Sequence, residues 1–127
     1  MSASEPLTVH VGELRGRGHE VEIVQDGSRS YVILQGYRLP DSLYAPEMTD
    51  LMVMADYQYP QSRMDMFWTS PTVTLTNGSL PQQADVFEIY AGRTWQRWSW
   101  HYPVWDPRIH TIHTHLAVCD DRLQRGV

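Results

Sequence analysis

The most constraining feature of this chain is a cluster of tryptophans near its C-terminal end. Four of its five tryptophans, Trp95, Trp98, Trp100 and Trp105, lie within eleven residues. A segment this aromatic is not free coil, because rings of this size are normally packed against other side chains. We interpret it as a rigid aromatic platform that leads into a packing helix and presents one or two polar groups. His101 lies directly against the tryptophans and is the first such group.

A helix is predicted directly after this platform. Apolar residues recur there at spacings of three and four, the period of an amphipathic helix, at Ile109, Ile112, Leu116, Cys119 and Leu123. Asp106 is expected to be the N-cap and Pro107 the first helical residue. Gly126 would end the helix. Cys119 lies in the middle of the stripe, so we interpret it as a small core side chain.

Length, charge and cysteine content exclude several classes of protein. The 127 residues suit one domain, residues 1–127, with a core of one sheet and a few helices. The net charge of −5 argues against nucleic acid as a partner. No window holds the roughly 18 apolar residues of a membrane span, and we expect neither a membrane interaction nor a signal peptide. The single cysteine suits a reducing compartment, so we expect a cytoplasmic protein.

The rest of the chain predicts an α+β fold. Pro6, preceded by Ser4 or Glu5 as a cap, begins a short helix that ends at the glycines 16 and 18. Residues 19–25, 30–37, 49–57 and 65–69 have strand patterns, with a hairpin turn at Asp26-Gly27. We therefore predict a four-stranded antiparallel meander flanked by an N-terminal and a C-terminal helix. The pattern weakens over residues 72–91, where 86–90 would be a short edge strand or an extended loop.

This order of elements resembles the ubiquitin-conjugating-enzyme fold. Residues 59–60 (Tyr-Pro) and 66–69 (Met-Phe-Trp-Thr) look like that family's tyrosine-proline turn and last strand. Residues 77–80 (Asn-Gly-Ser-Leu) look like the turn just ahead of its active-site cysteine, and residues 105–107 (Trp-Asp-Pro) like the tryptophan before its later helix. The Asp-Met-Phe-Trp and Trp-Gln-Arg-Trp-Ser-x-His runs are similar to a bacterial branch of this superfamily.

The resemblance implies a function and partners. The chain would be the conjugating-enzyme-like component of a bacterial ubiquitin-like modification pathway, of the kind associated with antiphage defence, and would need no cofactor. Its partners would be a ubiquitin-like protein and a ubiquitin-activating-like enzyme of the ThiF type. One departure bears on mechanism, because Pro81 stands where the family pattern places its nucleophilic cysteine. The resemblance therefore implies either transfer by a non-cysteine route or a catalytically inactive scaffold.

Three residues are candidates for the chemistry of such a site. His101 would move a proton during acyl transfer, since histidine titrates near neutral pH, unless it only hydrogen-bonds a loop carbonyl. Ser79 would form an oxyester if a base such as His101 took its proton; otherwise it is an ordinary turn serine. Asn77 would donate side-chain hydrogen bonds to an oxyanion, or would only tolerate a positive φ in the turn.

The histidines of the last helix suggest a metal site less strongly. His110 and His113 share a helical face, whereas His115 points elsewhere. The apolar stripe already occupies the buried face, so these three side chains are expected on its flanks or in solvent. Without a cysteine partner they do not make the ligand set of a closed zinc site. We therefore predict no metal.

Overall fold

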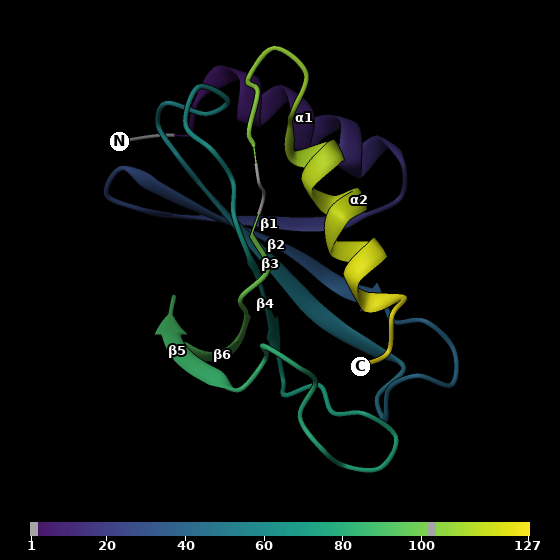
Figure 1. The fold of residues 1–127 in the computed structure, drawn as a ribbon. Coiled ribbons are helices and arrows are strands. Elements are labelled where there is room, and N and C mark those ends of the chain that lie inside the picture. Colours follow the sequence, from purple (N-terminus) through teal and green to yellow (C-terminus); the bar gives the residue numbers. More distant parts are fainter. Residues whose placement is uncertain (1–2, 102–103) are drawn as a thin grey trace.

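The computed structural model describes residues 3–101 and 104–127. Within them the chain forms two helices and one six-stranded sheet. In chain order the elements are α1 (Glu5–Gly16), β1 (Glu20–Asp26), β2 (Arg29–Arg38), β3 (Met48–Asp56), β4 (Phe67–Ser70), β5 (Val86–Tyr90), β6 (Arg93–Trp98) and α2 (Ile112–Leu123). The strand order is β1-β2-β3-β4-β6-β5 and every neighbouring pair is antiparallel. Both helices lie on the same side of the sheet (Figure 1). The predicted α+β class is confirmed.

The N-terminal helix follows its sequence signals. The Ser4 side chain caps it by accepting a hydrogen bond from the Leu7 backbone N–H at 3.2 Å, which satisfies one of the free donors at a helix start. Leu7, Val11 and Leu14 are all buried against the sheet. The predicted cap of this helix is confirmed.

The meander of β1 to β4 is also confirmed, with small shifts. Asp26 pairs with Arg29, so the two-residue turn consists of Gly27 and Ser28 and lies one residue later than predicted. The middle of β2 is buried on both faces, as its continuous apolar run predicts. β4 begins at Phe67, two residues after the predicted start.

The prediction of four strands was wrong, because a further hairpin extends the sheet. Residues 86–90 do form the edge strand β5, but the first tryptophans belong to a sixth strand, β6, that pairs with both β4 and β5. The turn between them consists of Ala91 and Gly92, with φ angles of 51° and 73°. Positive φ at both positions is the pattern of a type I′ hairpin turn.

The tryptophans of β6 pack on opposite faces of the sheet. Trp98 lies in the core beneath the helices, stacked on Phe67 with ring centroids 5.1 Å apart. Trp95 lies in a second cluster with Trp68 on the face that carries no helix. The aromatic platform is therefore a strand that contributes to two cores, followed by an extended segment.

The helix α2 begins later than predicted. Its N-cap is Thr111, whose side chain forms a capping box with Thr114, so Asp106 is not the cap and Pro107 is not helical. The Asp106 carbonyl instead accepts hydrogen bonds from the backbone N–H groups of Ile109 and His110, which closes a separate turn. Ile109 is consequently 65% exposed and outside the core. The other members of the predicted stripe are buried, at Ile112, Leu116, Cys119 and Leu123.

The side chain of Gln96 makes several of the hydrogen bonds that hold the long segment between β4 and β5 on the sheet. The Gln96 amide oxygen accepts from the Thr69 hydroxyl at 2.9 Å and from the Val73 N–H at 2.7 Å. Its amide nitrogen donates to the carbonyls of Val73 and Ala84 at 2.9 and 3.0 Å.

Among the described residues, neither helix is long and apolar enough to cross a membrane.

Candidate functional site

His101 lies in the extended segment that follows β6, outside any strand, as predicted. Two backbone hydrogen bonds fix this segment. The Ser99 N–H donates to the Gln83 carbonyl at 2.8 Å, and the Trp100 carbonyl accepts from the Met66 N–H at 3.1 Å. The histidine is thus held at the junction between the start of β4 and the loop before β5.

The imidazole of His101 is paired with a carboxylate. Its Nδ1 lies 2.8 Å from Oδ2 of Asp65, and its side chain is 61% exposed. Because an ionised carboxylate can only accept, Nδ1 carries the proton of this hydrogen bond. In the neutral ring Nε2 is then the basic nitrogen, so the pair has the form of a base oriented by an acid.

Asp65 also lines a hollow on the face of the sheet without helices. The hollow has a volume of about 410 Å³, and its lining includes Met66, Trp68 and Tyr90 together with charged side chains. Glu88 contributes to it and is itself held by the Trp68 indole N–H at 2.9 Å and by Arg97 at 3.1 Å. The carboxylate partner of His101 therefore belongs to a mainly charged depression whose wall also contains two aromatic rings.

Ser79 and Asn77 are brought together by the turn that contains them. The backbone N–H and the hydroxyl of Ser79 both donate to Oδ1 of Asn77, at 2.9 and 2.6 Å. The positive φ of this turn, 88°, falls on Gly78. The hydroxyl proton of Ser79 is thus directed at an amide oxygen within its own turn.

The structure does not bring His101 against this turn. Among the described residues, no hydrogen bond or ion pair joins His101 to Asn77 or Ser79. The chain after β6 meets the loop between β4 and β5 at Gln83, through the Ser99 N–H, whereas the side-chain hydrogen bonds of Asn77 and Ser79 stay within their own turn. Their arrangement in this structure is not that of a serine–histidine pair.

Cys119 is enclosed in the core. It is 1% exposed, and burial raises the pKa of its thiol. A buried thiol with a raised pKa is a poor nucleophile, because the thiolate is the reactive form. The prediction that Cys119 is a core side chain is confirmed.

His110, His113 and His115 lie in three different environments. His110 Nδ1 accepts from the Asp106 N–H at 2.8 Å, and His113 Nε2 lies 2.9 Å from a carboxylate oxygen of Glu13 on α1. His115 was expected on a flank or in solvent, which is wrong. It is 2% exposed, and its Nε2 donates to the Met66 carbonyl at 2.7 Å. Burial lowers the pKa of His115 to about 4.

No candidate metal site emerges from these side chains. Among the residues that the structure describes, no three His, Cys, Asp or Glu side chains are placed so that they could hold a metal ion. The contacts of His110 and His113 instead serve a turn and the junction between the two helices.

Two residues of this region were missed from the sequence. Asp65 was assigned only to a strand, and no local pattern indicates that it pairs with a histidine 36 residues away. Arg122 was not considered, although it lies three residues after Cys119 on the buried stripe. It is 1% exposed and its guanidinium lies 5.1 Å from the Trp98 ring and 4.9 Å from the Trp100 ring. This contact holds α2 against the segment that leads to His101.

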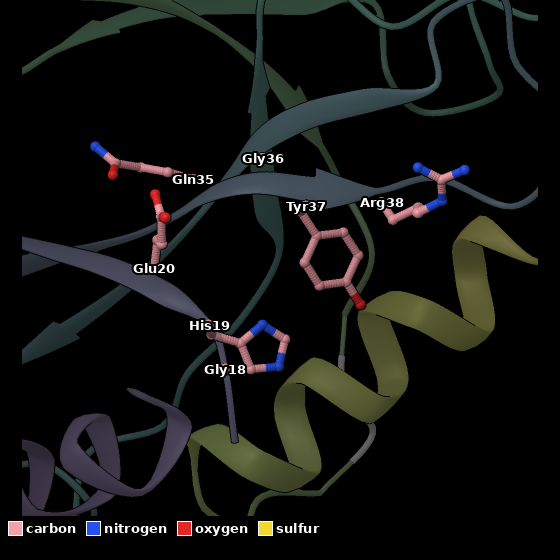
Figure 2. Close-up of a pocket in the computed structure, with 7 residues that line it drawn as sticks. All are labelled: Gly18, His19, Glu20, Gln35, Gly36, Tyr37 and Arg38. Carbon is pink, nitrogen blue, oxygen red and sulfur yellow. The ribbon is translucent and has the colours of Figure 1, made fainter. Parts of the chain in front are cut away.

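A second hollow lies elsewhere, at the ends of β1 and β2. It measures about 500 Å³, and Figure 2 shows the His19 and Tyr37 rings in its wall, beside α2. The two rings are stacked, with centroids 6.4 Å apart. None of the predicted site residues lines it.

The chain was also compared with known proteins. The sequence profile of prokaryotic E2 family E matches residues 8–126. No curated protein and no solved structure matches the chain significantly. The family match spans most of α1, the whole sheet, the His101 segment and α2, which is nearly all of the fold described above. The chain therefore belongs to prokaryotic E2 family E.

Proposed function

We propose that the chain is the conjugating-enzyme-like component of a bacterial ubiquitin-like modification pathway, with His101 as its proton-transfer group. Family membership supports a conjugating-enzyme-like component that works with a ubiquitin-like protein and an activating enzyme. The observation that carries the mechanism is the 2.8 Å contact between His101 and Asp65 at the hollow. We further propose an activating enzyme of the ThiF type, a cytoplasmic location and a role in antiphage defence.

The proposed step is acyl transfer with His101 as general base and then general acid. The lone pair of an acceptor amine attacks the carbonyl carbon at the ubiquitin-like C-terminus, which is held as a thioester by its activating enzyme or as an oxyester on Ser79. His101 Nε2 takes the proton that the amine loses as the new C–N bond forms. The C–O or C–S bond then breaks, and the imidazolium returns this proton to the leaving group. Asp65 holds the ring in place and stabilises the imidazolium.

The route differs from transfer through an enzyme cysteine. Cys119 is buried, so it cannot receive the acyl group without unfolding of the core. In the form of the reaction that passes through an oxyester, the Ser79 hydroxyl first leaves Asn77, and its turn moves to His101. The hydroxyl oxygen then attacks the C-terminal carbonyl carbon while His101 Nε2 takes its proton, the C–S bond to the activating enzyme breaks, and the imidazolium protonates the leaving thiolate. The side-chain nitrogen of Asn77, which is not part of that contact, would then donate to the oxyanion.

The second candidate function is a catalytically inactive scaffold. The Ser79 hydroxyl is engaged within its own turn and the only thiol is buried, and both observations favour docking without chemistry. In that case the chain would bind the ubiquitin-like protein or its activating enzyme and His101 would contribute only to the surface.

One reconstitution separates the two functions. The chain is mixed with the activating enzyme, the ubiquitin-like protein, ATP and an amine acceptor, and the products are followed on non-reducing gels. Catalysis predicts transfer that slows strongly in His101→Gln and Asp65→Asn but not in His19→Gln, an exposed histidine elsewhere. An adduct on the chain that resists thiols, is cleaved by hydroxylamine and is lost in Ser79→Ala identifies the oxyester form. Complex formation with neither transfer nor adduct contradicts catalysis and supports the scaffold.

A further inference from the structure

β5 forms one outer edge of the sheet, and its outward-facing backbone groups belong to two residues. In a type I′ hairpin the pair next to the turn, here Tyr90 and Arg93, exchanges backbone hydrogen bonds. Because this pattern alternates along an antiparallel pair, the N–H and C=O groups of Glu88 also point toward β6. Those of Phe87 and Ile89 point away from the sheet, toward its open edge.

The side chains of the same two residues are exposed and apolar. Phe87 is 44% exposed and Ile89 is 75% exposed. Edge strands are usually protected by charged side chains, prolines or bulges, because an open edge readily pairs with another strand. The opposite edge of this sheet follows the rule, since β1 presents three exposed acidic side chains at Glu20, Glu22 and Asp26. β5 has no such protection at its outward positions.

Glu88, the one charged residue of β5, is already paired with Arg97 of the same chain. Both carboxylate oxygens of Glu88 are held within the chain, one by the Trp68 indole and the other by Arg97. Two copies of β5 could therefore approach with their Glu88 residues opposite each other at little electrostatic cost. A free carboxylate at this position would instead repel its counterpart.

We propose that β5 pairs antiparallel with β5 of a second copy of this chain, about a two-fold axis at Glu88. Phe87 of each copy then lies opposite Ile89 of the second copy. These two residues exchange both backbone hydrogen bonds, because their N–H and C=O groups are the outward ones. The pairing joins the two six-stranded sheets edge to edge.

A second copy fits this edge better than an unrelated strand because the sequence of β5 is nearly symmetric about Glu88. Phe87 and Ile89 flank it on one face, and Val86 and Tyr90 lie two positions away on the other. An isologous interface needs this self-complementarity, whereas a heterologous strand does not. Glu88 and Tyr90 also line the hollow beside Asp65, so the pairing places the two hollows on either side of the joint. The pairing does not depend on the function proposed above.

Sedimentation velocity of the full chain over a range of concentrations tests the pairing. We expect a concentration-dependent dimer whose dissociation constant rises at least tenfold in Ile89→Lys, and also in Phe87→Glu. Val9→Lys is the matched control, because Val9 is a similarly exposed aliphatic residue on α1, at 53%. Circular dichroism checks that each variant is folded. A chain that stays monomeric at all concentrations, or a dimer unaffected by Ile89→Lys, overturns the proposal.

Oxidative crosslinking tests the register. Glu88→Cys is expected to form an intermolecular disulfide, because position 88 faces itself across the axis. Val86→Cys is the control that should not, since position 86 faces Tyr90 of the second copy, and the buried Cys119 is silent in both. If the chain is monomeric and Ile89→Lys instead abolishes binding of the ubiquitin-like protein, the edge takes a heterologous strand and the second copy is refuted.

Discussion

At the scale of single residues, Cys119 decides whether the chain can act through a thiol. It is 1% exposed and burial raises the pKa of its thiol. We predict that Cys119→Ala leaves the rate of ubiquitin-like transfer unchanged and lowers the free energy of unfolding by about 1 kcal/mol, through loss of a small core group. Transfer assays and urea denaturation measure the two effects. Loss of transfer in a variant that remains folded would contradict the non-cysteine route.

His115 gives the stability of the fold a pH dependence. Its pKa is lowered from 6.5 to about 4 in the folded protein, mainly by burial. As the pH falls below about 6.5 the unfolded chain therefore binds a proton before the folded one does, and the folded state loses stability until the pH reaches about 4. The full effect is roughly 3 kcal/mol.

The matched variant for this prediction is His115→Gln, which keeps a side-chain donor near the Met66 carbonyl but does not titrate. Urea denaturation midpoints between pH 7 and 4.5 should fall more steeply in the wild-type chain than in the variant. His10, whose pKa is also lowered mainly by burial, contributes equally to both curves and cancels in the difference. Parallel curves would show that His115 does not control this dependence.

Of the residues of the candidate site, His101 could be predicted from the sequence, whereas Asp65 and Arg122 could not. His101 stood out because it follows a run of tryptophans outside any strand. Asp65 did not, because the pair depends on where the sheet brings two segments 36 residues apart. Arg122 was not considered for a different reason, since arginine is almost never fully buried and is therefore not expected among core side chains. Its burial depends on two tryptophan rings from another element.

At the scale of elements, the β5–β6 hairpin is the part of the sheet that the local sequence pattern did not predict. Residues Trp95 and Gln96 are both buried although they point to opposite faces, so β6 lacks the alternation of a half-exposed strand. Its turn contains Ala91 at a φ of 51°, a conformation for which asparagine or glycine is the usual signal. The sequence signal that was available for this hairpin is Gly92, the second residue of the two-residue turn between β5 and β6. The predicted start of α2 was wrong because Asp106 and Thr111 both have side chains that can cap a helix. The packing of the fold selects Thr111.

Gln96 makes three hydrogen bonds to the backbone of the segment between β4 and β5. Gln96→Leu would leave the Val73 N–H and C=O groups and the Ala84 carbonyl buried without their partner. We predict a loss of roughly 3 kcal/mol in the free energy of unfolding, the scale of a few buried unpaired groups. Hydrogen exchange should also become faster in residues 71–85.

Gln124→Leu is the control for this prediction, because Gln124 is exposed on the C-terminal side of α2. Urea denaturation and hydrogen exchange by mass spectrometry measure both variants. Equal protection of residues 71–85 in wild type and Gln96→Leu would mean that other contacts order this segment.

At the scale of the whole molecule, both helices cover one face of the sheet. The hollow beside Asp65 lies on the other face, which carries no helix. α1, β1 to β4 and α2 follow from caps, turns and periodicity, so their order and the α+β class could be predicted. The uncovered face could not, because it is assembled from β2, β3, β4 and β6 together. The His101–Asp65 pair, the hollow beside it and the open edge of β5 all depend on that assembly.

The central claim is that His101 moves the proton during transfer, and a single-turnover rate tests it most directly. The rate of transfer to an amine is measured for wild type, His101→Gln and the control His19→Gln, with binding of the ubiquitin-like protein measured in parallel. The account predicts a fall of about 10²- to 10⁴-fold for His101→Gln, the usual contribution of a general base, with unchanged binding. A His101→Gln variant that binds and transfers at the wild-type rate would contradict it.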